Sequence, residues 1–305
     1  MMLSITSRRW AIVLVGLLLL AIFPFFFIGG PGTYSAPLFR SLWDCGHIVF
    51  FAGIVVIART KFNIAGWRPF IVVSLIAVAV GGVIEVIQAH TGREGNWQDL
   101  LNDVAATWLA LLWLQKSNLW IWAGRVLAMA LLMPPVTTVF FAAWAQLHAE
   151  RNFPILANFE SSIDLHGWKG NVERTKAVQS SGDYSLKVHL NTEKYSGAAF
   201  SEFHNSWQGY TTLAFDLYNP ESRPIELVIR ISDLRHELGD NDRTDRFNKK
   251  LHIAHGWNRV DIPVATIQQA PSTRKLEMDS ITSIVIFSTR LPIAQDIYVD
   301  NILLK

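Results

Sequence analysis

The sequence predicts an α-helical transmembrane bundle of about five helices followed by an all-β jelly-roll sandwich. Charge is divided unevenly along the chain: residues 1–150 carry 15 of the 52 charged side chains, and residues 151–305 carry the other 37. The first part consists of long uncharged runs, whereas apolar and polar residues alternate over short runs in the second. We therefore expect a membrane domain over residues 1–150, a linker over 151–157 and a β-sandwich over 158–305.

Composition excludes several classes of protein. Half of the residues are hydrophobic and 17% are charged, which excludes a mostly disordered chain. The net charge of +2 at pH 7 provides no basic stripe, so nucleic acid is not an expected partner. Cys45 is the single cysteine, which excludes an intramolecular disulfide and a cysteine-rich zinc site.

Five apolar runs are candidates for membrane-spanning helices, since a span needs about 20 mostly apolar residues. The first follows Arg8 and Arg9, and its length and the runs after it favour a retained helix over a cleaved signal peptide. The last contains Pro134 and Pro135, which predict a bend. The runs cover residues 11–28, 43–58, 70–88, 100–115 and 119–147.

Basic residues near the ends of these runs predict the orientation of the bundle. With a cytoplasmic N-terminus, seven Lys and Arg residues fall on the inner side, and Arg40 and Arg93 fall on the outer side. Five spans then place residues 158–305 outside the cytoplasm. If the short fourth run did not cross, the sandwich would instead be cytoplasmic.

Polar and ionisable side chains gather at the outer ends of the predicted helices, where an apolar setting marks them as functional candidates. Neighbouring members are three or four positions apart and so share a helix face. Such a group can transfer protons, hold a polar headgroup or bind a cation; a purely structural polar network is the alternative. The candidates are Asp44, His47, Glu85, Gln88, Arg93, Asp99, Asn102 and Asp103.

These residues form a compound motif within about residues 10–116, namely Asp44-x-x-His47, Glu85-x-x-Gln88, Gly92-Arg93 and Asp99-x-x-Asn102. The motif resembles that of the VanZ-like membrane family, named after a protein that gives low-level resistance to the glycopeptide antibiotic teicoplanin. The resemblance implies a multi-pass protein of the bacterial inner membrane, linked to the cell envelope or to a glycopeptide-antibiotic response. It implies no particular reaction.

The second part of the chain predicts eight or nine strands and no long helix. Leu186, Val188 and Leu190 alternate with polar residues, and similar segments continue to residue 304. Turn signals such as Asn219-Pro220 separate the segments. Short half-buried strands of this kind indicate a two-sheet sandwich or a jelly roll.

Short segments within the predicted sandwich carry a second resemblance. They cover residues 158–160, 167–168, 181–186, 256–258 and 298–302. Together they resemble a carbohydrate-binding-module or galactose-binding-like jelly roll over about residues 157–305. The resemblance implies a structural calcium ion between the first and last strands, held by Glu160 and Asp300; a plain charge pair or solvated carboxylates are the alternative.

Sugar binding requires an aromatic face flanked by polar groups. Trp168 and Trp257 belong to the fold signature, and we expect them in the core. The long segment 233–248 is either a ligand-contacting loop or a solvated one. The candidate ligand-binding residues are Tyr195, Trp207 and Tyr210 in or near loops, together with Asp233, His236 and Arg246 in that segment.

The function expected from the sequence is binding of an envelope polysaccharide or a lipid-linked glycan by an exported sandwich at the bilayer surface. One alternative is a membrane enzyme acting on such a substrate, with Glu85, Asp99 or His47 as acid or base. Another is a membrane-anchored scaffold without catalysis.

Overall fold

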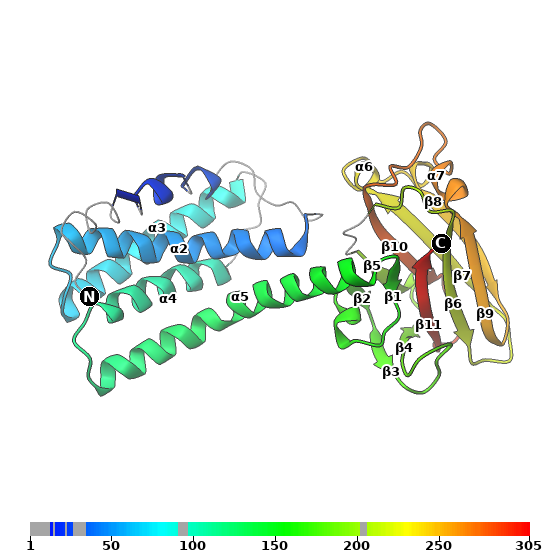
Figure 1. The fold of residues 1–305 in the computed structure, drawn as a ribbon, viewed down its shortest axis with the longest axis horizontal. Helices are drawn as coiled ribbons and strands as arrows, with labels where there is room; N and C mark the ends of the chain where they lie inside the picture. Colours follow the sequence, from blue (N-terminus) through cyan, green and yellow to red (C-terminus); the bar gives the residue numbers. More distant parts are fainter. Residues whose placement is uncertain (1–12, 15, 22, 27–34, 91–96, 202–205) are drawn as a thin grey trace. The chain divides into compact units, whose positions relative to one another are not determined.

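The computed structural model describes residues 13–14, 16–21, 23–26, 35–90, 97–201 and 206–305 (Figure 1). The chain forms two compact units, Met1–Ala142 and Ala143–Lys305. The first is helical and the second is mainly β-structure. They are called the helical unit and the sandwich unit below.

The apolar runs of the first unit form helices. The long ones are α2 (Pro37–Lys61), α3 (Trp67–His90), α4 (Trp97–Trp113) and α5 (Leu119–Asn152), which extends into the sandwich unit. Residues 13–14 and 16–21 are helical as well, and η1 (Phe23–Phe26) is a 3-10 helix.

Three helices in the described part of the chain, α2, α3 and α5, are long and apolar enough to cross a membrane. The 17 residues of α4 span about 25 Å, which is less than the hydrocarbon core of about 30 Å. That five helices cross the membrane therefore stays a prediction.

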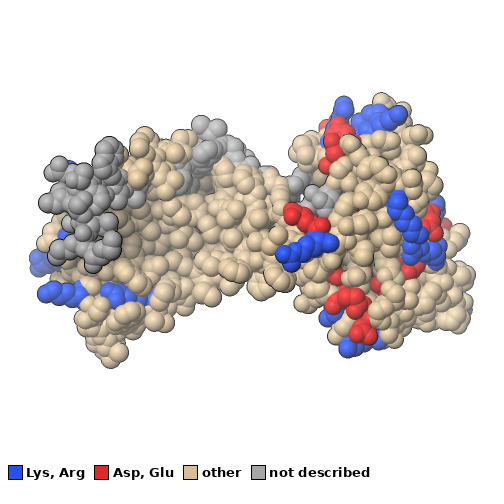
Figure 2. All heavy atoms as spheres, viewed as in Figure 1, with Lys and Arg blue, Asp and Glu red and all other residues tan. Residues whose placement is uncertain are grey.

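The outside of the helical unit is apolar. The side chains of Leu75, Val86 and Phe140 are 64%, 59% and 78% exposed. On the face drawn in Figure 2, the described part of this unit is almost entirely without charge, apart from Lys and Arg side chains at one end. An apolar surface of this extent is unfavourable in water, so the helices suit a lipid environment.

Helix α4 packs against both α2 and α3. Ala105 and Ala106 are fully buried on α4, and their small size lets the helices approach closely. On α3, Gly81 leaves room for Leu100 and Asp103, because a Cβ atom there would lie 2.9 Å and 2.7 Å from their side chains. This glycine contact seats the first turns of α4 against α3.

Arg125 on α5 holds the C-terminal end of α4. Its guanidinium donates hydrogen bonds to the carbonyl oxygens of Leu112, at 3.0 and 3.2 Å, and Gln115, at 3.2 Å. It also lies over the rings of Trp113 and Trp122, 5.1 and 4.8 Å from their centroids. The last carbonyls of a helix lack intrahelical donors and carry partial negative charge, so a buried cation stabilises them in both respects.

Helix α5 continues through Pro134 and Pro135 as a single helix. Neither proline supplies a backbone N–H to the helix. The hydroxyl groups of Thr137 and Thr138 donate to the carbonyl oxygen of Pro134, each at 2.9 Å. The helix backbone thus provides acceptors for both threonine hydroxyls in an apolar setting.

The described residues of the sandwich unit form eleven strands in two antiparallel sheets. In the first sheet the order is β3-β4-β11-β6-β9, with β1 also paired to β11; in the second it is β2-β5-β10-β7-β8. The sequence predicted eight or nine strands, because three-residue strands such as β1 and β2 are too short to show alternation. The strands are β1 (Ile155–Ala157), β2 (Trp168–Gly170), β3 (Val172–Thr175), β4 (Ser185–Leu190), β5 (Ser196–Phe200), β6 (Thr212–Asn219), β7 (Ile225–Asp233), β8 (Phe247–Ile253), β9 (Gly256–Pro263), β10 (Ile281–Ser288) and β11 (Gln295–Leu304).

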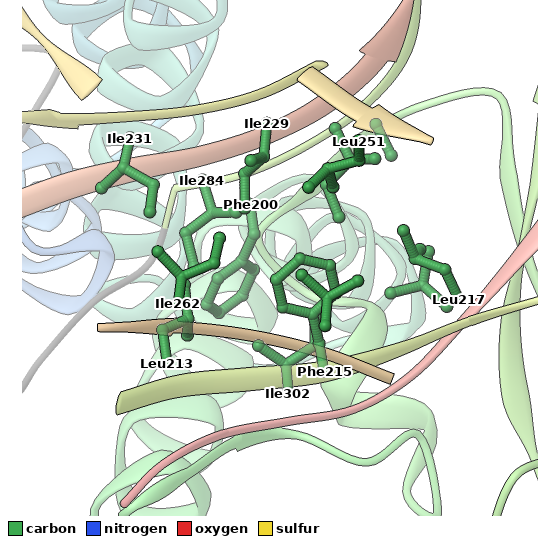
Figure 3. Close-up of a cluster of buried hydrophobic side chains, with 14 of the residues drawn as sticks. Phe200, Leu213, Phe215, Leu217, Ile229, Ile231, Leu251, Ile262, Ile284 and Ile302 are labelled. Atoms are coloured by element: carbon green, nitrogen blue, oxygen red, sulfur yellow. The ribbon is translucent and has the colours of Figure 1, made fainter. Parts of the chain in front are cut away.

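The two sheets enclose an apolar core (Figure 3). Phe215 and Leu217 of β6 and Ile229 and Ile231 of β7 are among its buried side chains. In β7 the buried side chains alternate with less buried ones over most of the strand, as the sequence predicted. In β6, Leu213, Phe215 and Leu217 are buried as predicted, but Ala214 and Asp216 between them are buried as well. Short helices lie in the connections: η2 (Ser162–Leu165), α6 (Leu234–Glu237), η3 (Arg243–Asp245) and α7 (Val264–Gln268).

Arg274 joins two parts of the long segment 233–248. It contacts both carboxylate oxygens of Asp233, at 2.6 and 2.8 Å, and both of Asp245, at 2.6 and 2.7 Å. Burial opposes the ionisation of Asp233, but hydrogen bonds from Arg274 and from the backbone N–H groups of Glu277 and His236 hold its pKa below the usual value. The ion pair therefore ties the end of β7 to η3.

Replacing Arg274→Ala is expected to lower the free energy of unfolding of the sandwich unit by about 3–5 kcal/mol, because Asp233 is left buried without its cation. Chemical denaturation of the full chain, followed by its β-sheet signal, measures the loss. Arg235→Ala is the matched control: Arg235 is 65% exposed, 3.9 Å from Glu277, and its loss should cost less than about 1 kcal/mol.

The effect of this ion pair depends on pH in a defined direction. The folded pKa of Asp233 is below its unfolded value, so the stabilisation is complete above the unfolded value of about 3.9 and is lost as pH falls through the folded pKa. Wild type and Arg274→Ala should therefore converge in acid. An equal loss in the Arg274 and Arg235 variants at neutral pH would contradict this assignment.

Candidate functional site

Polar side chains from three helices meet in the helical unit. His47 Nδ1 lies 3.1 Å from Asp103 Oδ1, which joins α2 to α4, and both side chains are buried. His47, Glu85 and Asp99 each offer one possible ligand atom, and these three atoms lie within 4.8 Å of one another. We call His47, Glu85, Asp99 and Asp103 the helical cluster. The helix spacing in the sequence predicted that such residues share faces, and the structure brings them together.

The other sequence candidates that the structure describes lie on the same three helices. Gln88 and Asn102 are both buried, and Asn102 Oδ1 accepts a hydrogen bond of 3.4 Å from Gln98 Nε2. Asp44 lies half-buried on α2, one turn before His47. Arg93 lies outside the described residues.

Asp103 is the deepest member of the helical cluster. Its side chain is fully buried, and Oδ2 has no hydrogen-bond partner among the residues that the structure describes. Gly81 provides the space for this carboxylate, because a Cβ atom at Gly81 would lie 2.7 Å from Oδ2. Thr107 donates to the backbone carbonyl of Asp103 at 2.8 Å, which fixes the helix locally.

The arrangement suits proton transfer or cation binding. When a carboxylate accepts the N–H of one imidazole nitrogen, it fixes the ring orientation and the tautomer, so the second nitrogen carries the lone pair. Glu85 and Asp99, next to that imidazole, are half-buried and thus reachable from outside the helices.

A second candidate surface lies on the first sheet of the sandwich unit. Tyr298 of β11 pairs with Tyr218 of β6, which pairs with Trp257 of β9. The ring centroids of Tyr218 lie 5.8 Å from Tyr298 and 5.2 Å from Trp257. Leu217 and Val299, next to these residues, point into the core, so the three rings point outward. We call Tyr298, Tyr218 and Trp257 the aromatic row.

Trp257 corrects an expectation from the sequence, which placed it in the core. It is 36% exposed, whereas Trp168 is buried as expected. The alternation of Trp257, Arg259 and Asp261 with the buried Val260 and Ile262 was the signal that could have shown its outward direction.

Charged groups flank the aromatic row. Next to Tyr298, Lys187 of β4 forms ion pairs with Asp296 at 3.1 Å and Glu173 at 3.3 Å. Two positions along β6 from Tyr218, Asp216 accepts a 2.8 Å hydrogen bond from Arg259. Burial opposes the ionisation of Asp216, but hydrogen bonds from Arg259, Asn301 and Ser180 lower its pKa.

The structure does not gather the ligand-binding aromatic residues predicted from the sequence. Trp207 is fully buried in the core, so its ring presents no face to a ligand. Tyr210 is half-buried and packs against Phe153, with ring centroids 5.3 Å apart. Tyr195 is 60% exposed, immediately before β5 in the second sheet.

The predicted ligand-binding residues of segment 233–248 are largely enclosed. Asp233 and His236 are buried; Asp233 is held by Arg274, and His236 Nδ1 lies 3.4 Å from Asp245. Arg246 is half-buried and donates to Asn241 Oδ1 at 3.1 Å. Their contacts are those of a structural network within the loop.

The carboxylates of Glu160 and Asp300, which were predicted to hold a calcium ion, both accept backbone hydrogen bonds. Glu160 Oε1 accepts hydrogen bonds from the backbone N–H groups of Asp183 and Tyr184, at 2.9 and 3.1 Å. Asp300 accepts backbone N–H donors on both oxygens, including those of Ser180 at 2.9 Å and Asn301 at 2.8 Å. Calcium requires several oxygen ligands, and the sequence predicted only these two, so a calcium ion at this place stays a prediction.

Comparison with known proteins gives likenesses to solved structures. No family model matches the chain, and no curated protein matches it. A family 11 carbohydrate-binding module from Clostridium thermocellum, solved with a β-1,3-1,4-mixed-linked tetrasaccharide, is 18% identical; the match covers 49% of this chain and 93% of that one, with a TM-score of 0.36.

Two further solved structures are similar over the same share of the chain. A CBM28 module specific for non-crystalline cellulose is 14% identical, covering 50% of this chain and 94% of that one, with a TM-score of 0.35. The CBM22-1 xylan-binding domain from Paenibacillus barcinonensis is 16% identical, covering 50% and 93%, with a TM-score of 0.33. These likenesses concern the C-terminal part and do not identify a ligand of this chain.

Replacing Gly81→Ala is expected to displace the Asp103 carboxylate and break its contact with His47. Overpacking of this kind costs about 1–3 kcal/mol, measured by thermal unfolding of the full chain in detergent with a helix signal. Gly82→Ala is the matched control, since a Cβ atom at Gly82 meets nothing within 4 Å. It should be neutral or stabilise by up to about 1 kcal/mol. Equal stabilities of the two variants would contradict the seating of Asp103.

Proposed function

We propose that this protein is a membrane-anchored carbohydrate-binding protein, and that its glycan site is the aromatic row. The observation that carries the proposal is the set of three adjoining rings on an outer sheet face. Tyr298, Tyr218 and Trp257 lie outside the core of the sandwich, so its folding does not require aromatic rings at these positions. Trp257 is exposed and the two tyrosines are half-buried, and aromatic groups that touch one another at a surface are typical of binding sites.

The chemistry of the surface fits a sugar. A sugar ring has an apolar C–H face that stacks on an aromatic ring and hydroxyl groups that need hydrogen-bond partners. The aromatic row supplies rings for the C–H face. The Lys187 ammonium and the Asp296 carboxylate beside it supply donors and acceptors for the hydroxyl groups. Because the rings follow one another across three strands, an extended glycan chain fits the surface better than a single sugar.

Trp257→Ala and Tyr218→Ala are each expected to weaken glycan binding about tenfold or more, because a buried aromatic contact contributes more than about 1.4 kcal/mol. A glycan array with the full chain in detergent identifies the ligand, and titration of that glycan measures its affinity. Tyr195→Ala, which removes an exposed ring on the other sheet, is the matched control and should bind normally. If Tyr195→Ala loses glycan binding and Trp257→Ala keeps it, the site lies at Tyr195 instead. If the wild type binds no glycan, the proposal is wrong.

We propose further that the helical unit is a VanZ-like bundle of the bacterial inner membrane, with a cytoplasmic N-terminus and an extracytoplasmic sandwich. The basic residues between the helices support this orientation. Arg59 and Lys61 end α2, and Arg68 begins α3. The Gly66 N–H donates to Gln115 Oε1 at 3.2 Å, so the α2–α3 and α4–α5 connections lie at the same end of the unit. The helical cluster belongs to the opposite helix ends, away from the basic residues.

A reporter that is active only in the cytoplasm tests this topology. Fused after Lys305, it is expected to be inactive, whereas the same reporter fused after Asn63, between α2 and α3, should be active. The reason is that the basic α2–α3 connection is retained on the cytoplasmic side. Activity of the Lys305 fusion would show that the sandwich is cytoplasmic and would overturn the topology.

A membrane enzyme acting on a glycan or a lipid-linked substrate is the second candidate function. The contact of His47 with Asp103, next to Glu85 and Asp99, favours it, because an oriented imidazole beside carboxylates can act as acid or base. Such an enzyme would lose turnover in Gly81→Ala and keep it in Gly82→Ala.

A further inference from the structure

We propose that the helical cluster binds a divalent transition-metal ion through His47, Glu85 and Asp99. The proposal goes beyond glycan binding by the sandwich unit and does not depend on it. One ring nitrogen of His47 and one carboxylate oxygen from each acidic residue are the ligands.

The ligand geometry suits a single ion. The three candidate atoms come from three different helices and lie within 4.8 Å of one another. Bonds of about 2.0–2.2 Å from a metal to nitrogen and oxygen place its ligands about 3.4 Å apart in a tetrahedral site, so modest side-chain rotation completes the site. Because α4 packs on α2 and α3, the backbone positions of the three ligands are already set.

Asp103 provides the second observation. Its Oδ1 lies 3.1 Å from His47 Nδ1, and it is not itself one of the three ligands. A carboxylate that accepts the N–H of a metal-binding histidine fixes the ring and raises the basicity of the ligating nitrogen. With Nδ1–H directed to Asp103, Nε2 carries the lone pair that a metal requires.

Asp103 is also buried to an extent that favours a nearby cation. It is 0% exposed, and its Oδ2 has no hydrogen-bond partner among the described residues. A buried carboxylate with one unpaired oxygen carries a desolvation penalty, and the positive charge of a metal ion bound to the adjacent imidazole offsets part of it.

The donor set selects the class of metal. One imidazole nitrogen and two carboxylate oxygens suit Zn²⁺ or Mn²⁺, whereas calcium takes six to eight oxygen ligands and Cu(I) prefers sulfur. Three protein ligands leave coordination positions open, as in catalytic rather than structural zinc sites. Water or an oxygen of a phosphate or carboxylate group is the expected occupant of an open position.

The test uses the full chain purified in detergent and stripped of metal with a chelator. Zn²⁺ and Mn²⁺ are each titrated, and Co²⁺ serves as the spectroscopic probe of a site with nitrogen and oxygen ligands. The wild type is expected to bind one equivalent of Zn²⁺ or Mn²⁺. His47→Ala and Glu85→Gln should each weaken that binding more than tenfold. Asp103→Asn should weaken it about 10- to 100-fold, because its effect passes through His47.

Matched controls separate the site from ordinary surface binding. His90→Ala removes an exposed imidazole at the end of α3, and Glu150→Gln removes an exposed carboxylate on α5; both should bind as the wild type does. If His47→Ala does not fold, the metal affinity of Glu85→Gln and the Co²⁺ spectrum of the wild type still test whether the metal site exists. Absence of a stoichiometric site, or equal affinities of Glu85→Gln and Glu150→Gln, would overturn the proposal. Neither result depends on glycan binding, so the two proposals fail separately.

Discussion

A buried charged side chain needs a partner, and both units of this protein contain side chains of that kind at the points where elements meet. Asp103 on α4 contacts His47 on α2, and Arg125 on α5 satisfies the last carbonyls of α4. In the sandwich unit, Arg274 joins Asp233 to Asp245. An uncompensated buried charge costs several kcal/mol, so arrangements of the helices and loops that separate these partners are strongly disfavoured.

The two surfaces proposed for function differ from these stabilising contacts. They carry side chains that the stability of the fold does not require. The aromatic row places three large rings outside a core that is already filled by leucine, isoleucine and phenylalanine. The helical cluster places Glu85 and Asp99 beside His47 in an otherwise apolar unit. Departures of this kind from the local folding rules are where function is expected. A glycan-binding sheet and a metal-binding cluster would give one protein a recognition surface and a chemically active one.

Local patterns in the sequence were enough to predict the classes of both units. The uncharged runs predicted apolar helices, and period-two alternation predicted an antiparallel sandwich. The i, i+3 and i, i+4 spacings also predicted that His47, Glu85 and Asp99 lie on helix faces suited to a shared site. Spacing along one helix says nothing of which helices touch, so the contact between His47 and Asp103 and the space at Gly81 required the folded structure.

Tryptophan shows most clearly what the sequence determined by itself and what only the tertiary structure decided. Residue type and alternation determined that tryptophans would take part in either a core or a binding face. The tertiary structure decided which: Trp207, near a loop in the sequence, is enclosed by the core, whereas Trp257 pairs across β6 and β9 with Tyr218 on the outer face. Exposure depends on how distant strands cover one another, and that covering is a long-range property that no local pattern contains.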